Sequence, residues 1–498
     1  MDNYSFNPLT QELCEIPTVI DDASGIGDFI SFNQGKPIVV VQGLGFVGAV
    51  MSLVCANAIK GDYAVIGVDL ADEANYWKIK SINDGQFPLV AEDPKIAQFF
   101  ESAKTKGNFY ATYDSSAYSY ADVIIVDINL DVQKSSSEHN ALESFTVNLT
   151  SFKRAIGIIG QNCKEDATIL VETTVPPGTC INIVQPLLAQ ELCKRNLPGD
   201  RIKIGHSYER VMPGPDYIDS IRCYPRVYSG VNTYGAEAIE GFLNTIIDTS
   251  SCQLTRLENT NATEIAKVLE NAYRATNIAF AVEWSRFAEE AGVDLYGIIN
   301  AIRCRKTHSN LMFPNIGVGG YCLTKDPLLA SWARKKFFGA DSDLEMSVNS
   351  VSTNDQMPVY AYERLKEVFG SVYGTDVVFL GVSYRGDVGD TRFTPVELLV
   401  NLVKSDGAQV KLHDPFVSYW QELSCEVESD INKVLVSEPD LVIISTAHSV
   451  YKKEAFIDKI SSVPASKIYD AVGLLSNEQI QKLKSKHRVS VLGRGDIS

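Results

Sequence analysis

Short runs of β-branched and aliphatic residues alternate with longer amphipathic stretches along most of the chain. After Lys36 the short runs predict strands, which lie at residues 38–41, 64–68, 123–126, 168–171 and 202–204. The stretches between them have the periodicity of helices. Strands that alternate with helices predict a parallel sheet covered by helices on both faces.

The pattern changes twice after this region. Residues 261–302 are predominantly helical and amphipathic, far longer than an ordinary globular helix. After Met357 and Pro358 a second alternating run begins, with strands predicted at 376–381, 409–413 and 441–445. We therefore predict an α/β protein with two Rossmann-like parallel-sheet domains, joined by a long helical segment. The predicted boundaries are an extension at 1–35 and domains at 36–235, 236–358 and 359–498.

The first 35 residues show no sustained periodicity, so this extension is expected either to be mobile or to pack onto the body. No basic segment followed by an apolar run marks a secretory signal. The apolar stretch 37–59 contains three glycines, Gln42 and Asn57, which fit a strand, turn and helix better than a membrane span.

Charge and cysteine content narrow the function classes. The net charge of −17 argues against a nucleic-acid binder, which usually needs a basic face. The ten cysteines include no Cys-x-x-Cys pair and no cluster with zinc spacing. This predicts free thiols in a reducing compartment, a cytoplasmic protein and no structural metal.

A glycine-rich turn follows the first strand of the sheet. It reads Gln42-Gly-Leu-Gly-Phe-Val-Gly48 and runs into a helix. Gly43 permits the tight turn, Gly45 lets a pyrophosphate approach the backbone, and Gly48 allows close packing of helix on strand. Asp69 ends the second strand, where a carboxylate accepts hydrogen bonds from a ribose and disfavours a 2′-phosphate. The motif predicts a dinucleotide site, with NAD favoured over NADP.

A second glycine-rich stretch precedes a cysteine, in Gly317-Val-Gly-Gly-Tyr-Cys-Leu-Thr-Lys-Asp-Pro327. The glycines let the backbone pass close to a bulky ligand. A thiol such as Cys322 can attack an aldehyde or acyl carbon. The alternative is a buried cysteine in a tight turn, which is the commoner case for a cysteine considered alone.

Four other groups of polar residues are candidates for binding or catalysis. Thr173 and Thr174 follow one strand and Glu209 and Arg210 follow another, at the edge where open α/β sheets bind ligands. On the long helix Glu264, Lys267 and Asn271 share one face. Arg385 and Arg392 follow a strand of the second run and suit a phosphate or carboxylate. Taken singly, the two threonines are equally consistent with ordinary turn chemistry, a Glu–Arg pair is usually a solvated or paired surface charge, and the helix face is more often simply solvated.

In this order the motifs resemble the UDP-glucose/GDP-mannose dehydrogenase family, from about Lys36 to about Leu475. The Gly-x-Gly-Gly-x-Cys-x-x-Lys-Asp-Pro stretch is the most specific element. Further support comes from Ile82-Asn-Asp-Gly85 with Pro88, Thr-Val-Pro-Pro-Gly, the Lys267/Asn271 pair, Asn354-Asp-Gln-Met-Pro358 and Gly381-Val-Ser-Tyr-Arg385.

The resemblance implies an NAD-dependent, four-electron oxidation of a sugar C6 alcohol to a carboxylate, with two NAD+ used in turn. Cys322 would capture the intermediate aldehyde, and the thioester formed from it would be hydrolysed. Lys267 and Asn271 would stabilise oxyanions. Asp326 and Thr174 would hold a water molecule, and Glu209 would assist hydrolysis.

The resemblance also implies two sets of binding residues and a homodimer or higher homo-oligomer assembled through the long helical segment. The cofactor set is Gly43, Gly45, Phe46, Val47, Gly48, Asp69, Thr173, Lys325 and Arg392. The set for a UDP-sugar substrate is Glu209, Arg210, Lys267, Asn271, Gly317, Gly319, Gly320, Tyr384 and Arg385.

Departures from the family pattern bear on the substrate. Where many members have a second glutamate after the one matching Glu209, this chain has Pro213. That form resembles the branch acting on UDP-linked 2-acetamido sugars, so UDP-N-acetylglucosamine or UDP-N-acetylmannosamine is favoured over UDP-glucose. The segment 126–129 lacks the usual Val-Pro-Thr-Pro, and Arg385 replaces a lysine. A two-electron alcohol dehydrogenase and an idle nucleotide-sugar-binding protein remain the alternatives.

Overall fold

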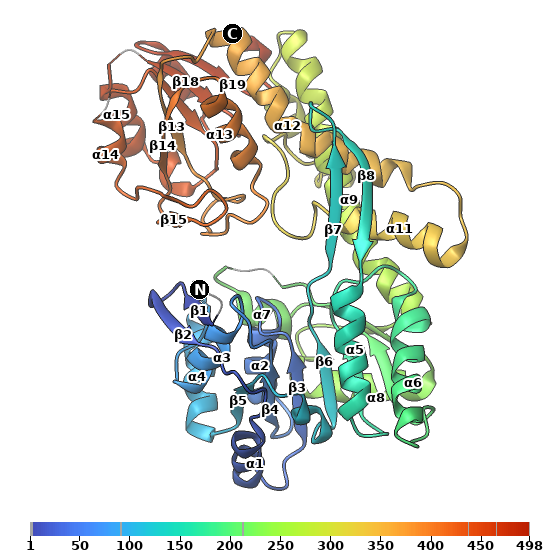
Figure 1. Ribbon diagram of the computed structural model, residues 1–498. Helices are drawn as coiled ribbons and strands as arrows, with labels where there is room; N and C mark the ends of the chain where they lie inside the picture. The colour runs from blue at the N-terminus through green and yellow to red at the C-terminus, as the bar shows by residue number, and fades with distance from the viewer. Residues whose placement is uncertain (1–2, 90–91, 212–213, 437, 465, 498) are drawn as a thin grey trace. The chain divides into compact units, whose positions relative to one another are not determined.

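The computed structural model describes residues 3–89, 92–211, 214–436, 438–464 and 466–497. The chain divides into two compact units (Figure 1). Unit 1 comprises residues 1–131, 147–268 and 336–339, and unit 2 comprises residues 132–146, 269–335 and 340–498.

Unit 1 is built on an eight-stranded sheet with the order β12-β11-β10-β9-β6-β3-β4-β5. Six strands from β5 to β10 are parallel and follow the order of dinucleotide-binding sheets. β11 pairs antiparallel to β10, which departs from the purely parallel prediction. The strands are β3 (Ile38–Gln42), β4 (Ala64–Val68), β5 (Phe109–Thr112), β6 (Val123–Val126), β9 (Thr168–Val171), β10 (Lys203–His206), β11 (Arg226–Gly230) and β12 (Leu254–Arg256).

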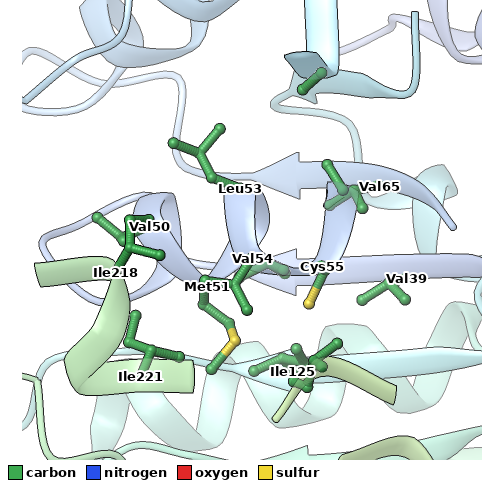
Figure 2. Close-up of a cluster of buried hydrophobic side chains, with 14 of the residues drawn as sticks. Val39, Val50, Met51, Leu53, Val54, Cys55, Val65, Ile125, Ile218 and Ile221 are labelled. Carbon is green, nitrogen blue, oxygen red and sulfur yellow. The ribbon is translucent and has the colours of Figure 1, made fainter. Parts of the chain in front are cut away.

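The core of unit 1 explains why the helix after the glycine turn has no polar face. Every residue of α2 (Gly48–Ala56) is buried, because α2 lies between the sheet and α7 (Tyr217–Arg222). Figure 2 shows Val50 and Met51 of α2 facing Ile218 and Ile221 of α7. The other helices of this unit are α3 (Tyr76–Asn83), α4 (Pro94–Lys106), α5 (Thr150–Asn162), α6 (Gln185–Lys194) and α8 (Thr233–Ile246).

The N-terminal extension packs onto unit 1, which settles the two expectations for it. It forms β1 (Tyr4–Asn7), β2 (Glu12–Glu15) and α1 (Ala23–Phe32). Ser5 Oγ donates to Glu73 O at 2.8 Å and accepts from Trp77 N at 3.1 Å. Asp22 accepts hydrogen bonds from the hydroxyls of Tyr110 and Thr112 at the edge strand β5. The extension therefore covers one edge of the sheet.

Unit 2 contains the second doubly wound sheet, with five parallel strands in the order β14-β13-β17-β18-β19. Alternate residues of β13 enter different cores: Val377 and Phe379 pack with α12 (Glu345–Phe369) and α13 (Pro395–Ser405), and Val378 and Leu380 with α15 (Glu454–Ser462) and α16 (Asn477–Lys484). The predicted fold class, with two Rossmann-like sheets, is confirmed. The strands are β13 (Asp376–Leu380), β14 (Gln409–His413), β17 (Leu441–Ile444), β18 (Lys467–Asp470) and β19 (Arg488–Val491).

The region 261–302, predicted as one long helical segment, consists of two helices. α9 (Thr260–Glu290) ends before Gly292, whose φ of +70° no helix allows, and α10 (Leu295–Arg303) follows. α11 (Asp326–Phe338) begins directly after the cysteine motif.

A polar β-hairpin that the hydrophobic pattern does not predict is formed by β7 (Asp131–Ser136) and β8 (Leu142–Asn148), drawn as two long arrows in Figure 1. It binds α12 through an ion pair of 2.6 Å between Lys134 Nζ and Asp355 Oδ2. Asn140 Nδ2 also donates to Asp355 O at 2.6 Å.

Candidate active site

The turn between β3 and α2 has the geometry that the glycine motif predicts. Gly43 has a φ of +98°, and a Cβ there would lie 2.1 Å from Asp127 O. A Cβ at Gly48 would lie 1.9 Å from Gly43 O, so helix and turn touch backbone to backbone. At Gly45 no described atom lies within 4 Å of such a Cβ, which leaves room for a phosphate. Phe46 and Val47 complete the turn, and Tyr217 donates a hydrogen bond to Phe46 O at 2.6 Å.

Asp69 lies beside this turn, at the end of β4. Its Oδ2 accepts from Leu44 N at 2.9 Å and its Oδ1 accepts from Leu70 N at 2.8 Å. Burial raises the pKa of this carboxyl, against the lowering effect of Lys78 and of the two backbone donors. Each oxygen keeps a second lone pair, so the carboxylate can accept from ribose hydroxyls. The residues of this edge fit a dinucleotide with an unphosphorylated ribose.

The hydroxyl of Thr173 joins the ends of two strands. Thr173 Oγ1 donates to Val126 O at 2.9 Å and accepts from Ile128 N at 2.8 Å. It thereby fixes the backbone of the segment 126–129. Thr174 follows and is half-buried.

Lys267 and Glu209, two residues singled out from the sequence, meet in unit 1. Lys267 Nζ donates to Glu209 O at 2.9 Å and lies 3.6 Å from Glu209 Oε1. The ammonium also stands 5.3 Å from the centre of the Tyr208 ring, and the Arg210 guanidinium stands 5.9 Å from the same ring. A cation is thus held next to a carboxylate at the carboxyl edge of the sheet. Position 213, used to favour an acetamido sugar, lies outside the described residues.

Glu264, the third residue of the predicted helix face, bonds to the backbone of the turn after β9. Its two carboxylate oxygens accept from Gly178 N at 2.6 Å and Cys180 N at 2.8 Å. Glu264 is fully buried, and burial raises its pKa from 4.5 to about 7 against the effect of these donors. It holds the Pro-Pro-Gly turn that follows Thr174.

In unit 2 the glycine loop before Cys322 is pressed against the loop that follows β13. A Cβ at Gly319 would lie 2.3 Å from Tyr384 Cβ. Gly317 and Gly320 have φ of +138° and +79°, and Gly320 N donates to Arg392 O at 3.0 Å. Only glycine permits this approach.

Cys322 itself is exposed, so the alternative of a buried structural cysteine is wrong. Its carbonyl oxygen accepts from Lys325 N at 3.2 Å and Asp326 N at 2.9 Å, which makes it the first acceptor of α11. In contrast, the thiols of Cys14, Cys55, Cys163, Cys180 and Cys252 are buried.

A buried polar network lies directly after Cys322 in the chain. Asp326 is fully buried, and its Oδ1 accepts from Lys325 Nζ at 2.8 Å. Its Oδ2 accepts from Asn271 Nδ2 at 2.7 Å. The Lys325 ammonium also lies 4.4 Å from the centre of the Tyr321 ring. The structure thereby brings Asn271, Lys325 and Asp326 together, while Lys267 lies one turn earlier on α9.

The loop after β13 carries the remaining predicted binding residues. Tyr384 is half-buried, and burial raises the pKa of its hydroxyl. Arg385 is exposed. Arg392 forms a two-pronged ion pair with Asp390, with Nη2 to Oδ2 at 2.6 Å and Nε to Oδ1 at 2.9 Å.

The position of Glu264 predicts a pH-dependent stability. The folded state holds the Glu264 proton up to a pKa of about 7, whereas the unfolded chain releases it near 4.5. Folding therefore loses free energy as pH rises through this window, by up to about 3 kcal/mol. We expect the thermal midpoint of the wild type to fall relative to that of Glu264→Gln between pH 5 and 7.5. The exposed Glu258→Gln is the control, and parallel midpoint curves for wild type and Glu264→Gln would contradict the assignment.

Three family models match the chain: the NAD binding domain of the UDP-glucose/GDP-mannose dehydrogenase family over residues 37–246, its central domain over 261–355 and its UDP binding domain over 378–477. None of the described helices is both long and apolar enough to cross a membrane.

Two relatives illustrate the similarity. A UDP-N-acetyl-D-mannosamine dehydrogenase of Methanocaldococcus jannaschii is 28% identical over 93% of this chain and 97% of its own. The solved structure of a UDP-D-ManNAc dehydrogenase from Pyrococcus horikoshii is 25% identical, with a TM-score of 0.76 over 92% of this chain and 100% of its own. The chain belongs to the UDP-glucose/GDP-mannose dehydrogenase family and is an NAD-dependent oxidoreductase with a UDP-sugar substrate.

Proposed function

We propose that this enzyme oxidises the C6 hydroxyl of a UDP-linked N-acetylhexosamine to a carboxylate, with UDP-N-acetylmannosamine as the first candidate. The observation that carries the proposal is the exposed Cys322 thiol, which follows a glycine loop packed against Tyr384 of the UDP binding domain. The names of the relatives support the acetamido sugar.

Bound NAD+ supplies the hydride acceptor for both oxidations. Gly43, Gly45, Gly48 and Asp69 would hold it, since the turn leaves space at Gly45 and the carboxylate is fixed beside it. Phe46, Val47, Thr173, Lys325 and Arg392 are proposed as further contacts, although Thr173 and Arg392 already bond within the protein.

Cys322 would act as the nucleophile toward the C6 aldehyde. Its sulfur forms a bond to carbon, and the carbonyl oxygen takes the displaced electron pair and then a proton. The product is a thiohemiacetal, whose carbon still carries a hydrogen that can leave as hydride together with the hydroxyl proton. A thioester results. Asn271 and Lys267 would donate hydrogen bonds to the oxyanions of these steps.

Hydrolysis then releases the product. Water adds to the thioester carbon, the C–S bond breaks, and the sulfur leaves as the thiol of Cys322. Asp326 and Thr174 would orient this water and Glu209 would take its proton. Asp326 is suited to a fixed position, because Lys325 and Asn271 hold its two oxygens. Arg210, Tyr384, Arg385 and the 317–320 glycines would bind the UDP-sugar.

The reaction stoichiometry tests this proposal. With UDP-N-acetylmannosamine, UDP-N-acetylglucosamine or UDP-glucose and excess NAD+, we expect two NADH and one uronic acid per sugar from the preferred substrate. Cys322→Ser should lower kcat for the completed oxidation by about 100-fold or more, because a serine hydroxyl is a far weaker nucleophile. Cys193→Ser, at another exposed cysteine, is the matched control.

The other outcomes identify the alternatives. One NADH per sugar with accumulated aldehyde would indicate a two-electron alcohol dehydrogenase. UDP-sugar binding without NADH formation would indicate an idle binding protein. Turnover of UDP-glucose alone would contradict the acetamido preference.

We also propose that the enzyme is a cytoplasmic homodimer that assembles through α9. Six large apolar side chains on the described part of this helix are exposed at spacings of three, four and seven residues: Ile265 (46%), Leu269 (62%), Tyr273 (52%), Phe280 (53%), Trp284 (46%) and Phe287 (58%). They form a stripe along one face. An apolar stripe of this length is costly to leave in water, and a second copy of the same helix would cover it. We also propose that the central helical domain, which contains α9, extends from residue 236 to residue 358.

The apolar stripe gives a direct prediction. Trp284→Asp should convert the dimer to a monomer in light scattering, because a charge would be buried in the interface. Tyr373→Asp changes a more exposed aromatic residue (79%) elsewhere in unit 2 and should leave the mass unchanged. A wild type that is monomeric at micromolar concentration would contradict the proposal.

A further inference from the structure

A buried histidine lies under the loop that carries Tyr384 and Arg385. His448 follows β17 and is fully buried, although the sequence offers no catalytic role for it. Its ring packs against two aromatic rings, with centroid distances of 5.2 Å to Phe416 and 5.4 Å to Tyr451. These contacts restrict the orientation of the imidazole.

The hydrogen bonds of His448 determine its tautomer. Asp387 N lies 2.9 Å from His448 Nδ1, and a backbone N–H can only donate, so Nδ1 must be the acceptor. Nε2 consequently carries the proton and donates to Asp414 Oδ2 at 3.0 Å. Asp414 is itself fully buried and also accepts from Val382 N at 2.8 Å. One neutral imidazole thus links two ends of the loop that follows β13.

The backbone of this loop is closely fitted to the segment around His448. Asp387 has a φ of +60°, a left-handed conformation that is costly for a residue other than glycine. Asp387 Oδ1 accepts from Ser449 N at 2.8 Å, while Asp387 N donates to His448. Asp387 is thus bonded twice to the segment 448–449. A Cβ at Gly386 would lie 2.2 Å from Ala447 O. Residues 447–449 therefore hold Gly386 and Asp387 in a conformation they would not keep alone.

We propose that His448 is a positioning residue for UDP, acting through the 383–387 loop. Its Nδ1 fixes Asp387 and so sets the orientation of Tyr384 and Arg385, the proposed contacts of the UDP moiety. His448 touches neither substrate nor cofactor. The inference rests on the proposed function, because it takes the UDP-binding role of this loop from there.

Two substitutions distinguish the roles of the two ring nitrogen atoms of His448. In His448→Asn, the side-chain oxygen lies where Nδ1 lay and can accept from Asp387 N. In His448→Gln, the side-chain NH2 lies where Nε2 lay and can donate to Asp414, but Asp387 N loses its acceptor. We expect His448→Gln to raise the dissociation constant for UDP about tenfold in calorimetry with the full chain, and His448→Asn to remain within about threefold of wild type.

Steady-state kinetics provide the second readout. His448→Gln should raise KM for the UDP-sugar by a similar factor and change kcat less than about twofold, since Cys322 and its network are intact. His487→Gln is the matched control, since His487 is a buried histidine bonded to Ser466 N at the opposite ends of the strands. It should leave UDP affinity unchanged, and thermal unfolding reports whether each variant folds.

The outcomes are distinguishable. If the Asn and Gln variants weaken UDP binding equally, or if neither weakens it, the role of Nδ1 is overturned. The proposed function would still stand in that case, provided that the wild type forms two NADH per sugar. A wild type that binds UDP with the expected variant pattern, yet oxidises no UDP-sugar, would overturn the proposed function and leave the positioning role standing.

Discussion

The contact on which unit 2 depends is the one between the glycine loop before Cys322 and the loop after β13. At Gly319 the backbone approaches Tyr384 so closely that a Cβ would lie 2.3 Å from Tyr384 Cβ. Gly320 N adds a hydrogen bond to Arg392 O. This contact joins Cys322, the proposed nucleophile, and the proposed UDP contacts into one packed structure. A side chain at Gly319 or Gly320 would have to separate the two loops. The position of Cys322 and the proposed binding of UDP therefore depend on the same close contact.

The two sheets use the same electrostatic device at equivalent positions. In unit 1 Asp69 follows the strand next to β3 and accepts from Leu44 N in the turn after β3. In unit 2 Asp414 follows the strand next to β13 and accepts from Val382 N in the loop after β13. A carboxylate that accepts backbone N–H groups holds the ligand loop of each sheet in place. The two carboxylates differ in their other partners, because Asp414 also accepts a hydrogen bond from His448.

Several parts of this structure could be predicted from local sequence. The strands at Ala64–Val68, Val123–Val126 and Thr168–Val171 match the hydrophobic runs residue for residue, because each is buried on both faces. The glycine turn at Gly43 was predictable from the spacing of its three glycines after a strand, although the backbone that crowds Gly43 is that of the distant Asp127. The cysteine motif was predictable only through the family resemblance, since a lone thiol is more often inert.

Other features depend on partners far away in the chain. The role of Glu264 requires Gly178 and Cys180, and that of His448 requires Asp387 and Asp414. No local pattern marks such pairs. The hairpin of β7 and β8 is polar on most positions, so its stability comes from bonds to α12 and not from an apolar face. The bonds of Glu264 could not be predicted, because helical periodicity gives the face of a residue but not what covers it.

The central claim is that the Cys322 loop and the UDP-binding loop form one site. Peptide-resolved alkylation by iodoacetamide measures this directly, because Cys322 is exposed and Cys193 and Cys304 are exposed internal references. We predict that saturating UDP slows alkylation of Cys322 about fivefold or more, by ordering the loop against which Gly319 packs, and leaves the reference cysteines unchanged. An unchanged rate at Cys322 when UDP is bound would contradict the account.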